Sequence, residues 1–284
     1  MKKPGLYILL LGFLAACSSP TDVVQGVINQ AKADAIATAI TTDSTEVIDS
    51  MTLVNLRPAE LKSAALLGCV AVSGDITDFD LDLVPAAALF TFNCTAVGRY
   101  GVQASLTGQL GVTDPSTDLS VNGFDSSLNN LNLAVIGMQD TAYTELRNGT
   151  RTVRYQGSSL NYAQDLDITR TFMLLGVAAS AQISNKLTYA LSANGGETLS
   201  FISPLPDSSV TVTGQFDWQS GEDKLVFNVT TPQALQYDSS CETMPLFSSG
   251  ELRASLVSAG GNGYIRIVYN GCGEVPTIRF ITTS

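Results

Sequence analysis

The chain has 284 residues, of which only 14% are charged and none is histidine, and its formal net charge is −11. The lack of histidine excludes Ser-His-Asp and Cys-His catalysis, most catalytic zinc sites and histidine acid–base chemistry. Because an acidic chain repels nucleic acids and anionic head groups, we expect no nucleic-acid partner.

The first sixteen residues have the pattern of a secretory signal. Lys2 and Lys3 precede an apolar stretch that runs from Tyr7 to Ala16. At about ten residues this stretch is far shorter than the ~20 that a membrane-spanning helix needs. We therefore expect an exported chain whose leader is removed.

The leader ends in Leu14-Ala15-Ala16-Cys17, which resembles the lipobox cut by the signal peptidase of bacterial lipoproteins. The resemblance implies that residues 1–16 are removed and that Cys17 carries a diacylglyceryl thioether, usually with an acylated amino group. Two or three acyl chains hold a protein firmly on a membrane. In that family Asp after the cysteine favours retention at the inner membrane. Ser18 therefore indicates anchoring at the outer membrane, with the protein facing the periplasm or the cell surface. The alternative is an ordinary secreted protein in which Cys17 stands by chance.

The mature chain has the composition of an exported β-protein. It retains 13 basic and 26 acidic residues, a net charge of −13, and it is rich in Ser, Thr, Gly and Asn. Its 268 residues suffice for one large all-β domain or two smaller ones. No linker rich in Pro or Gly divides the β region, so we divide the mature chain into a lipidated tether (17–21), a helical segment (22–68) and one antiparallel β domain (69–284).

Four cysteines remain after Cys17, an even number in an oxidising compartment. Three connectivities are open, and we favour Cys69 with Cys94 and Cys241 with Cys272, because each pair flanks a local segment. Closing loops of this size contributes about 3 to 4 kcal/mol each in the chain-entropy model. These spacings contain no Cys-x-x-Cys, so we assign no zinc site and no cofactor.

Two helices are expected before the β region. Asp22 can cap a helix over 22–41, in which apolar residues recur at helical spacing. Pro58 and Gly68 stand where a second, shorter helix can begin and end.

From Cys69 onward the apolar residues alternate with polar ones. Phe90, Phe92 and Cys94 share one strand face, and so do Val210, Val212, Phe216 and Trp218. The turns expected between strands are Asn148-Gly149, Ser220-Gly221 and Gly260 to Gly263. The fold predicted is mainly β, an antiparallel sandwich or a curved half-barrel sheet of about a dozen strands, with one or two N-terminal helices.

The densest acidic run contains Asp78, Asp80 and Asp82. Counted from Asp78, the EF-hand glycine and glutamate positions hold Leu83 and Leu89, so that calcium motif fails. We expect an edge strand with Phe79, Leu81 and Leu83 inward and the aspartates in water, and an irregular Ca²⁺ site is the alternative.

The basic cluster Arg147, Arg151 and Arg154 flanks the expected Asn148-Gly149 turn. We interpret these arginines as solvated hairpin residues, and a small-anion or acidic-glycan site is the alternative. Trp218 and Phe216, on an inward face, are assigned to the core.

Catalytic motifs other than paired carboxylates are missing. No mature lysine follows a serine by three residues, and there is no Gly-x-x-x-x-Gly-Lys sequence. The leading hypothesis is a non-enzymatic structural or binding module of the cell envelope, which contacts the membrane through Cys17 and takes an unknown protein, glycan or lipid ligand. The stretch 225–280 resembles the end of uncharacterised secreted lipoproteins of proteobacteria, a likeness that implies no activity.

Two rival functions remain open. The first is a periplasmic carrier of a lipid or another apolar ligand, which predicts a cavity lined by residues such as Phe90, Phe92, Phe227 and Ile267. The second is a carboxylate-dependent glycan hydrolase, which needs only two acids ~5 to 10 Å apart.

Overall fold

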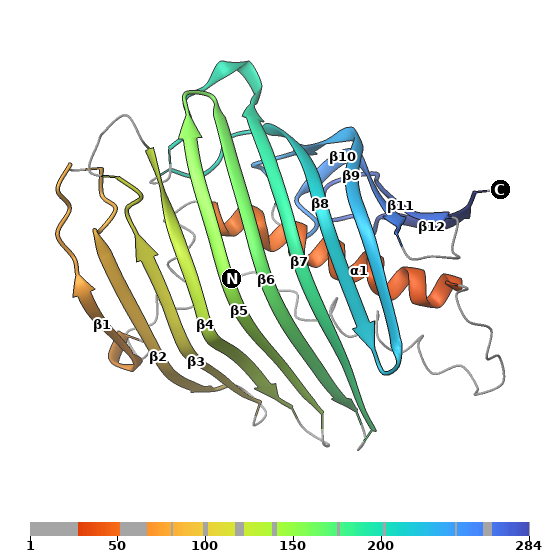
Figure 1. The fold of residues 1–284 in the computed structure, drawn as a ribbon, viewed down its shortest axis with the longest axis horizontal. Coiled ribbons are helices and arrows are strands. Elements are labelled where there is room, and N and C mark those ends of the chain that lie inside the picture. Colours follow the sequence, from red (N-terminus) through yellow and green to blue (C-terminus); the bar gives the residue numbers. More distant parts are fainter. Residues whose placement is uncertain are drawn as a thin grey trace.

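The protein is one antiparallel sheet curved around one helix (Figure 1). The computed structural model describes residues 28–51, 67–80, 82–98, 102–116, 122–137, 141–174, 177–200, 203–241, 243–257 and 263–283. The helix is α1 (Gln30–Ser50), and a short 3₁₀ turn, η3 (Leu67–Cys69), leads into the sheet. The twelve strands are β1 (Val70–Asp75), β2 (Ala87–Val97), β3 (Gln103–Thr113), β4 (Asn122–Ile136), β5 (Ala142–Gln156), β6 (Ser159–Leu174), β7 (Val177–Ala193), β8 (Ser208–Ser220), β9 (Asp223–Tyr237), β10 (Phe247–Leu256), β11 (Gly263–Tyr269) and β12 (Thr277–Thr282).

The order of the strands in the sheet is their order in the sequence. Each strand pairs antiparallel with its chain neighbours, and β1 and β12 form the two open edges. The predicted mainly β, antiparallel fold with an N-terminal helix is therefore confirmed.

Helix α1 fills the concave side of the sheet. In Figure 1 it runs behind β5 to β8, while β10 to β12 curl around one of its ends. The apolar side chains of the helix and its C-cap that have at most 2% of their surface exposed join the core of the sheet; they are Ala33, Ile36, Ala37, Ile40, Val47, Ile48 and Met51. Sheet and helix thus share a single core.

The helix lies further along the chain than the sequence predicts. The side chain of Asn29 caps it by accepting a hydrogen bond from the Lys32 amide (2.8 Å), whereas the predicted cap, Asp22, lies outside the described residues. The predicted end near residue 41 is wrong because the polar residues that follow, Asp43 to Thr45, are buried against the sheet and not exposed in a turn. The second helix, predicted from Pro58, falls mainly in 52–66, outside the described residues.

The predicted Asn148-Gly149 turn is wrong. Both residues lie inside β5, where Gly149 pairs with Leu128 of β4 and Leu166 of β6. Gly149 has φ +131°, and a Cβ atom there would lie 2.0 Å from the carbonyl oxygen of Asp165. Glycine is needed here because two backbones approach closely inside the sheet, and the turn between β5 and β6 lies at Gly157 instead.

Other hairpin predictions are confirmed. Strands β8 and β9 pair around Ser220-Gly221, with Phe216 opposite Phe227. Strands β10 and β11 also pair as expected, and Ile265, Ile267 and Tyr269 point into the core. The turn residues 258–262 lie outside the described part.

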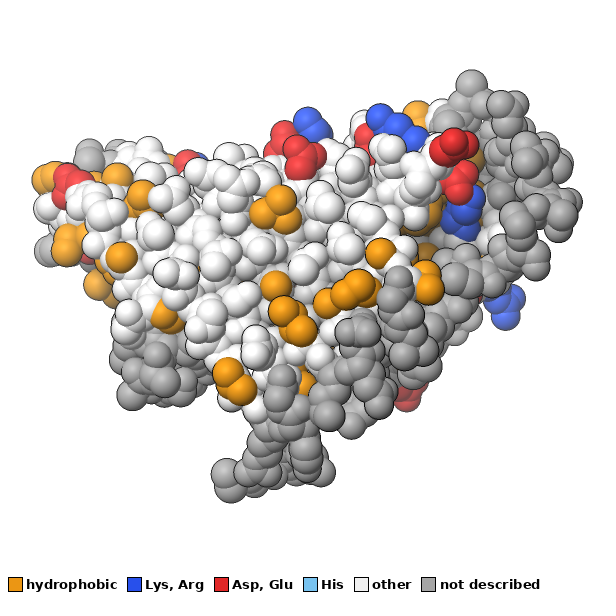
Figure 2. All heavy atoms as spheres, turned by 90° about the horizontal axis from the view of Figure 1, so that it is seen from below, with side chains coloured by type: hydrophobic (Ala, Val, Ile, Leu, Met, Phe, Trp, Pro, Cys, Tyr) orange, Lys and Arg blue, Asp and Glu red, His pale blue; other side chains and the backbone are white. Residues whose placement is uncertain are grey.

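The surface carries few charges. Figure 2 shows a face on which uncharged polar side chains and backbone predominate, with apolar side chains in small separate groups and the acidic and basic ones mostly near the upper rim of the view. This pattern agrees with the low charged fraction of the sequence.

Candidate functional site

The two predicted disulfides are formed. Cys69–Cys94 ties the residue before β1 to β2 and has a Cα–Cα distance of 4.9 Å. Cys241–Cys272 joins the β9–β10 loop to the β11–β12 loop, with a Cα–Cα distance of 5.7 Å. The predicted lipid-bearing Cys17 lies outside the described residues.

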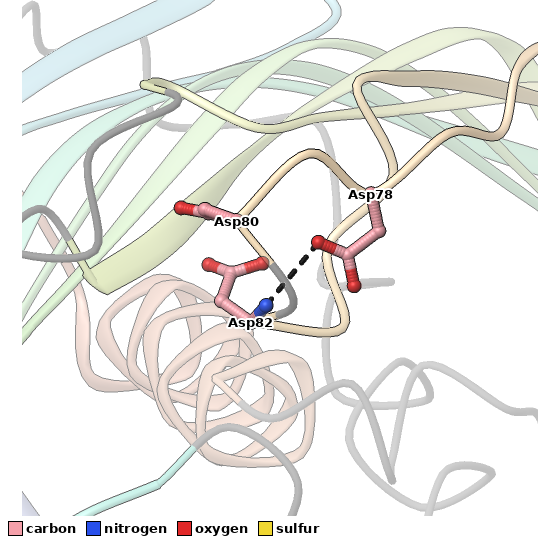
Figure 3. Close-up of side chains that lie close together, drawn as sticks. All are labelled: Asp78, Asp80 and Asp82. Atoms are coloured by element: carbon pink, nitrogen blue, oxygen red, sulfur yellow. Dashed lines mark hydrogen bonds between the residues drawn. The ribbon is translucent and has the colours of Figure 1, made fainter.

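The acidic run forms a loop and not the predicted edge strand. Between β1 and β2 the carboxylate of Asp78 accepts hydrogen bonds from the backbone amides of Asp82 (3.2 Å) and Leu83 (2.8 Å), which turns the chain back on itself (Figure 3). Leu83 has φ +74°, and it and Phe79 have 60% and 62% of their surface exposed, so neither points inward as predicted. The predicted inward residue Leu81 is outside the described residues. The edge strand is β1 instead.

We call the side chains of Asp78, Asp80 and Asp82 the acidic loop. Each presents a carboxylate oxygen to the others, and these oxygens all lie within 4.8 Å of one another. Figure 3 shows the three side chains lying close together on one short stretch of chain. The pKa of Asp82 is raised, mainly by burial and further by the charges of Asp80, Asp114 and Asp78. A hydrogen bond from the Val84 amide lowers the pKa and offsets part of this rise. The arrangement gathers three partly exposed carboxylates in one short loop.

The predicted solvated arginine cluster divides between the two faces of the sheet. Arg147 and Arg151 point to the concave side, where Arg151 is buried, because β5 continues through the expected turn. Arg154 lies on the outer face and pairs with Asp125 (2.7 Å). Only Arg154 therefore matches the expectation of a solvated side chain.

A buried ion-pair network joins α1 to the middle strands. Arg170 of β6 contacts Asp43 of α1 and Glu145 of β5, both at 2.6 Å, and Asn185 of β7 donates a hydrogen bond to Asp43 (3.1 Å). Arg147 of β5 pairs with Glu145 and with Glu46 of α1. We refer to these six residues as the helix-anchoring network.

Opposite charges set the protonation of this network. Burial pushes the pKa of Glu145 upward, but the charges of Arg147 and Arg170, with hydrogen bonds from Tyr143 and Arg170, outweigh it and lower the pKa to about 2. For Glu46 burial prevails over the attraction of Arg147 and raises the pKa. Glu145 is thus fixed as a charged partner of two arginines.

The helix-anchoring network is built to hold α1 and not to receive a substrate. The cavity beside it has a volume of about 10 Å³, room for roughly one water molecule. Sequence reasoning missed the network because Asp43 and Glu46 resemble the solvent-facing side of a helix. One signal was available, since Asp43 lies at helical spacing from Ile36, Ile40 and Val47 and so shares their face.

The outer face of the sheet carries a larger hollow, which we call the outer groove. Its volume is about 370 Å³, and it crosses β6, β7, β8 and the start of β9. Its polar lining consists of Asp167, Thr169, Gln182, Ser184, Asp217, Gln219 and Lys224. The residues between them, Ile168, Ile183 and Trp218, are buried in the core, which confirms the core assignment of Trp218.

No helix within the described ranges has the length and apolar character needed to cross a membrane. Comparison with protein-family models, with curated proteins and with solved structures finds no match to this chain.

Proposed function

We propose that the protein is an exported, lipid-anchored, non-enzymatic module of the cell envelope, with a structural or binding role. The main support for a module that does not carry a lipid is the filled concave side of the sheet. There α1 is held by apolar packing and by the helix-anchoring network. With the inside of the curve occupied, the outer face is the part left for a partner. The lipobox-like Leu14-Ala15-Ala16-Cys17 supports the anchor, and the two disulfides fit an oxidising compartment.

A lipid carrier fits this structure poorly. Phe227 and Ile267, expected to line its cavity, are completely buried in the packed core, and Phe92 has 6% of its surface exposed. A drug-sized apolar ligand needs a pocket of roughly 300 to 1,000 Å³ with a mainly hydrophobic lining. The outer groove reaches that volume, but seven of its ten lining residues are polar.

A glycan hydrolase is also disfavoured. Asp167 and Asp217 lie on either side of Ser184 in the outer groove, so two carboxyl groups do share one face there. However, a hydrolase keeps one carboxyl protonated by an apolar surround. Here both carboxyls lie on the polar outer face, and that of Asp217 accepts a hydrogen bond from Gln215 (2.7 Å). Such a lining supports reversible hydrogen bonding to a polar ligand, for which a glycan is the leading class.

The anchor is tested by following processing in cells. Globomycin, which inhibits lipoprotein signal peptidase, should cause a larger form that retains residues 1–16 to accumulate, and Cys17→Ser should do the same without the drug. Normal processing in both cases would remove the anchor from the proposal.

The binding role is tested on the purified, detergent-solubilised protein. Native mass spectrometry should give the mass of the chain plus its covalent lipid, with no further lipid bound. A glycan panel should show binding that Gln182→Ala weakens and no turnover. Co-purified lipid would favour the carrier, and glycan turnover would favour the hydrolase.

A further inference from the structure

Three polar side-chain atoms on the concave side of the sheet are buried without a hydrogen-bond partner among the described residues. They are Nε of Arg151, Nε2 of Gln164 and Oδ1 of Asn185. The residues that carry them have 8%, 6% and 0% of their surface exposed. An unpaired buried donor or acceptor is costly, because it has given up its hydrogen bonds to bulk water. Each of these atoms therefore needs a partner beyond the described protein atoms.

The register of the strands brings the three side chains together. Arg151 of β5 pairs directly with Gln164 of β6. Asn185 of β7 lies two residues from Leu187, the partner of Gln164, so it is the diagonal neighbour of Gln164 on the same face. All three line the cavity of about 10 Å³ beside the helix-anchoring network. The cavity is therefore bordered by two residues with a free donor and one with a free acceptor.

The other ends of the two amides are already used. Nδ2 of Asn185 donates to Asp43 (3.1 Å), and since an ionised carboxylate only accepts, this bond leaves the carbonyl oxygen of Asn185 free. Oε1 of Gln164 accepts from the hydroxyl of Tyr162 (3.1 Å), which leaves the amino group of Gln164 free. Arg151 takes part in none of the ion pairs found within the described ranges. A ligand in this cavity must therefore accept from two N–H groups and donate to one carbonyl oxygen.

Water meets this demand, whereas a small ion does not. A chloride ion can accept from both N–H groups but cannot donate to Asn185, and an ammonium ion can only donate. The formal charges of the lining also cancel, because it contains two acids and two arginines. Buried waters typically make about three hydrogen bonds to polar groups that lack other partners, and one water needs a cavity of roughly 10 to 15 Å³ or more. The cavity lies at the lower end of that range and so has room for a single molecule.

We propose that Arg151, Gln164 and Asn185 bind one structural water molecule. It accepts hydrogen bonds from Nε of Arg151 and Nε2 of Gln164 and donates one to Oδ1 of Asn185. Because Asn185 also holds Asp43, the water extends the helix-anchoring network from α1 and β7 to Gln164 and Arg151. The site goes beyond the envelope role proposed above and depends on neither the lipid anchor nor the outer groove.

A crystal structure of the full-length processed protein, from crystals soaked in sodium bromide, tests the site directly. We expect one density peak about 2.7 to 3.2 Å from each of the three unpaired atoms, the ordinary range of hydrogen bonds from N–H groups, and no anomalous bromine signal there. The absence of a peak would overturn the assignment. A peak that bromide replaces would overturn it as well, because it would identify an anion.

Oxygen-17 magnetic relaxation dispersion, which counts long-lived internal waters in solution, gives a second test. Gln164→Met removes one donor while it keeps a side chain of similar length, so the count should fall by one relative to the wild type. Gln103→Met, the same change at an exposed position of β3, is the matched control and should leave the count unchanged. An unchanged count in a Gln164→Met protein that is folded by far-UV circular dichroism would contradict the proposal. The crystallographic test uses the wild type alone, so it decides the assignment even where Gln164→Met does not fold.

Discussion

Individual buried charged residues hold α1 against the sheet. Arg170 has 7% of its side chain exposed and contacts two carboxylates on different elements, so its guanidinium balances two buried charges. Asp43 and Glu145, its partners, are just as buried. The removal of one partner from such a network costs more than the loss of the contact itself, because it leaves the other charge buried and unpaired.

Arg170→Ala should lower the free energy of unfolding by about 3 to 5 kcal/mol, because Asp43 and Glu145 lose their shared cation. The control is Arg154→Ala, which breaks a half-exposed pair with Asp125 and should cost about 1 kcal/mol or less. Urea denaturation followed by circular dichroism measures both. Equal effects of the two substitutions would contradict the structural role of the helix-anchoring network.

Glu145 also predicts a pH dependence. Its pKa is lowered to about 2 in the folded protein from an ordinary value of 4.5, so its contribution to stability is complete above pH 4.5 and is lost as the pH falls towards 2. A difference of roughly 2.5 pH units corresponds to about 3 kcal/mol. The raised pKa of Glu46 acts in the opposite direction and offsets part of this loss. The stability difference between wild type and Glu145→Gln should therefore shrink between pH 6 and pH 2, and a constant difference would count against the ion pairs.

The sequence predicts the pairing or orientation of some side chains correctly and gives no indication of others. The cysteine pairs could be predicted because each flanks a local segment, and the inward positions of Phe216 and Trp218 because strand alternation determines them. Arg170 could not, since an arginine on a strand is expected to face solvent until the strand is seen to pack against the helix. For Asp43 the one available signal was its helical spacing from buried apolar residues. Only tertiary structure brings together residues 127 positions apart.

At the scale of the element, β5 shows how a local signal fails. Asn-Gly is a strong hairpin signal between alternating strands, but the strand continues through it and pairs on both sides. The glycine is explained by the short distance to a neighbouring backbone, which no window of sequence around it contains. The prediction of a strand at the acidic loop failed for the reverse reason. Alternating acidic and apolar residues indicated a strand, but hydrogen bonds from backbone amides to the Asp78 side chain form a turn there.

Gly149→Ala should destabilise the protein by about 1 to 3 kcal/mol or more, because the new Cβ meets the Asp165 carbonyl oxygen at 2.0 Å and the φ of +131° strains any other residue. Gly68→Ala is the control, since nothing lies within 4 Å of a Cβ at that position. Thermal unfolding compares the two variants. A Gly149→Ala protein as stable as Gly68→Ala would contradict the close approach of the two backbones at this position.

At the scale of the whole molecule, helix and sheet form one cooperative unit. The helix contributes fully buried apolar side chains to the same core as the middle and C-terminal strands, and Lys32 ties its first turn to Asp223 of β9 (2.7 Å). The sequence indicates about a dozen antiparallel strands and a helix before them. It does not indicate that the helix lies inside the curve of the sheet, because the pattern of a strand that faces a helix is the same as that of a strand that faces another sheet.

Ile40→Ala should lower the free energy of unfolding by about 2 to 5 kcal/mol, since Ile40 is completely buried between α1 and the sheet. Far-UV circular dichroism and the fluorescence of Trp218, the single tryptophan, should report the same shifted transition. Ile76→Ala, with 68% of the side chain exposed in the wild type, should change stability by roughly 0.5 kcal/mol or less. Separate transitions for the two probes would show that helix and sheet unfold independently.

The sequential strand order has a consequence for how the chain acquires its structure. A ribosome makes the N-terminal region first, yet Asp43 and Glu46 of α1 find their cations only when β5 and β6 have been added about a hundred residues later. Hairpins between neighbouring strands can form as soon as each pair is complete, because they close only short loops. Most of the stability of a helix in a protein comes from tertiary packing, so α1 settles into place after the middle of the sheet exists. Among the described residues, the first structured segment to be synthesised is in this way one of the last to be secured.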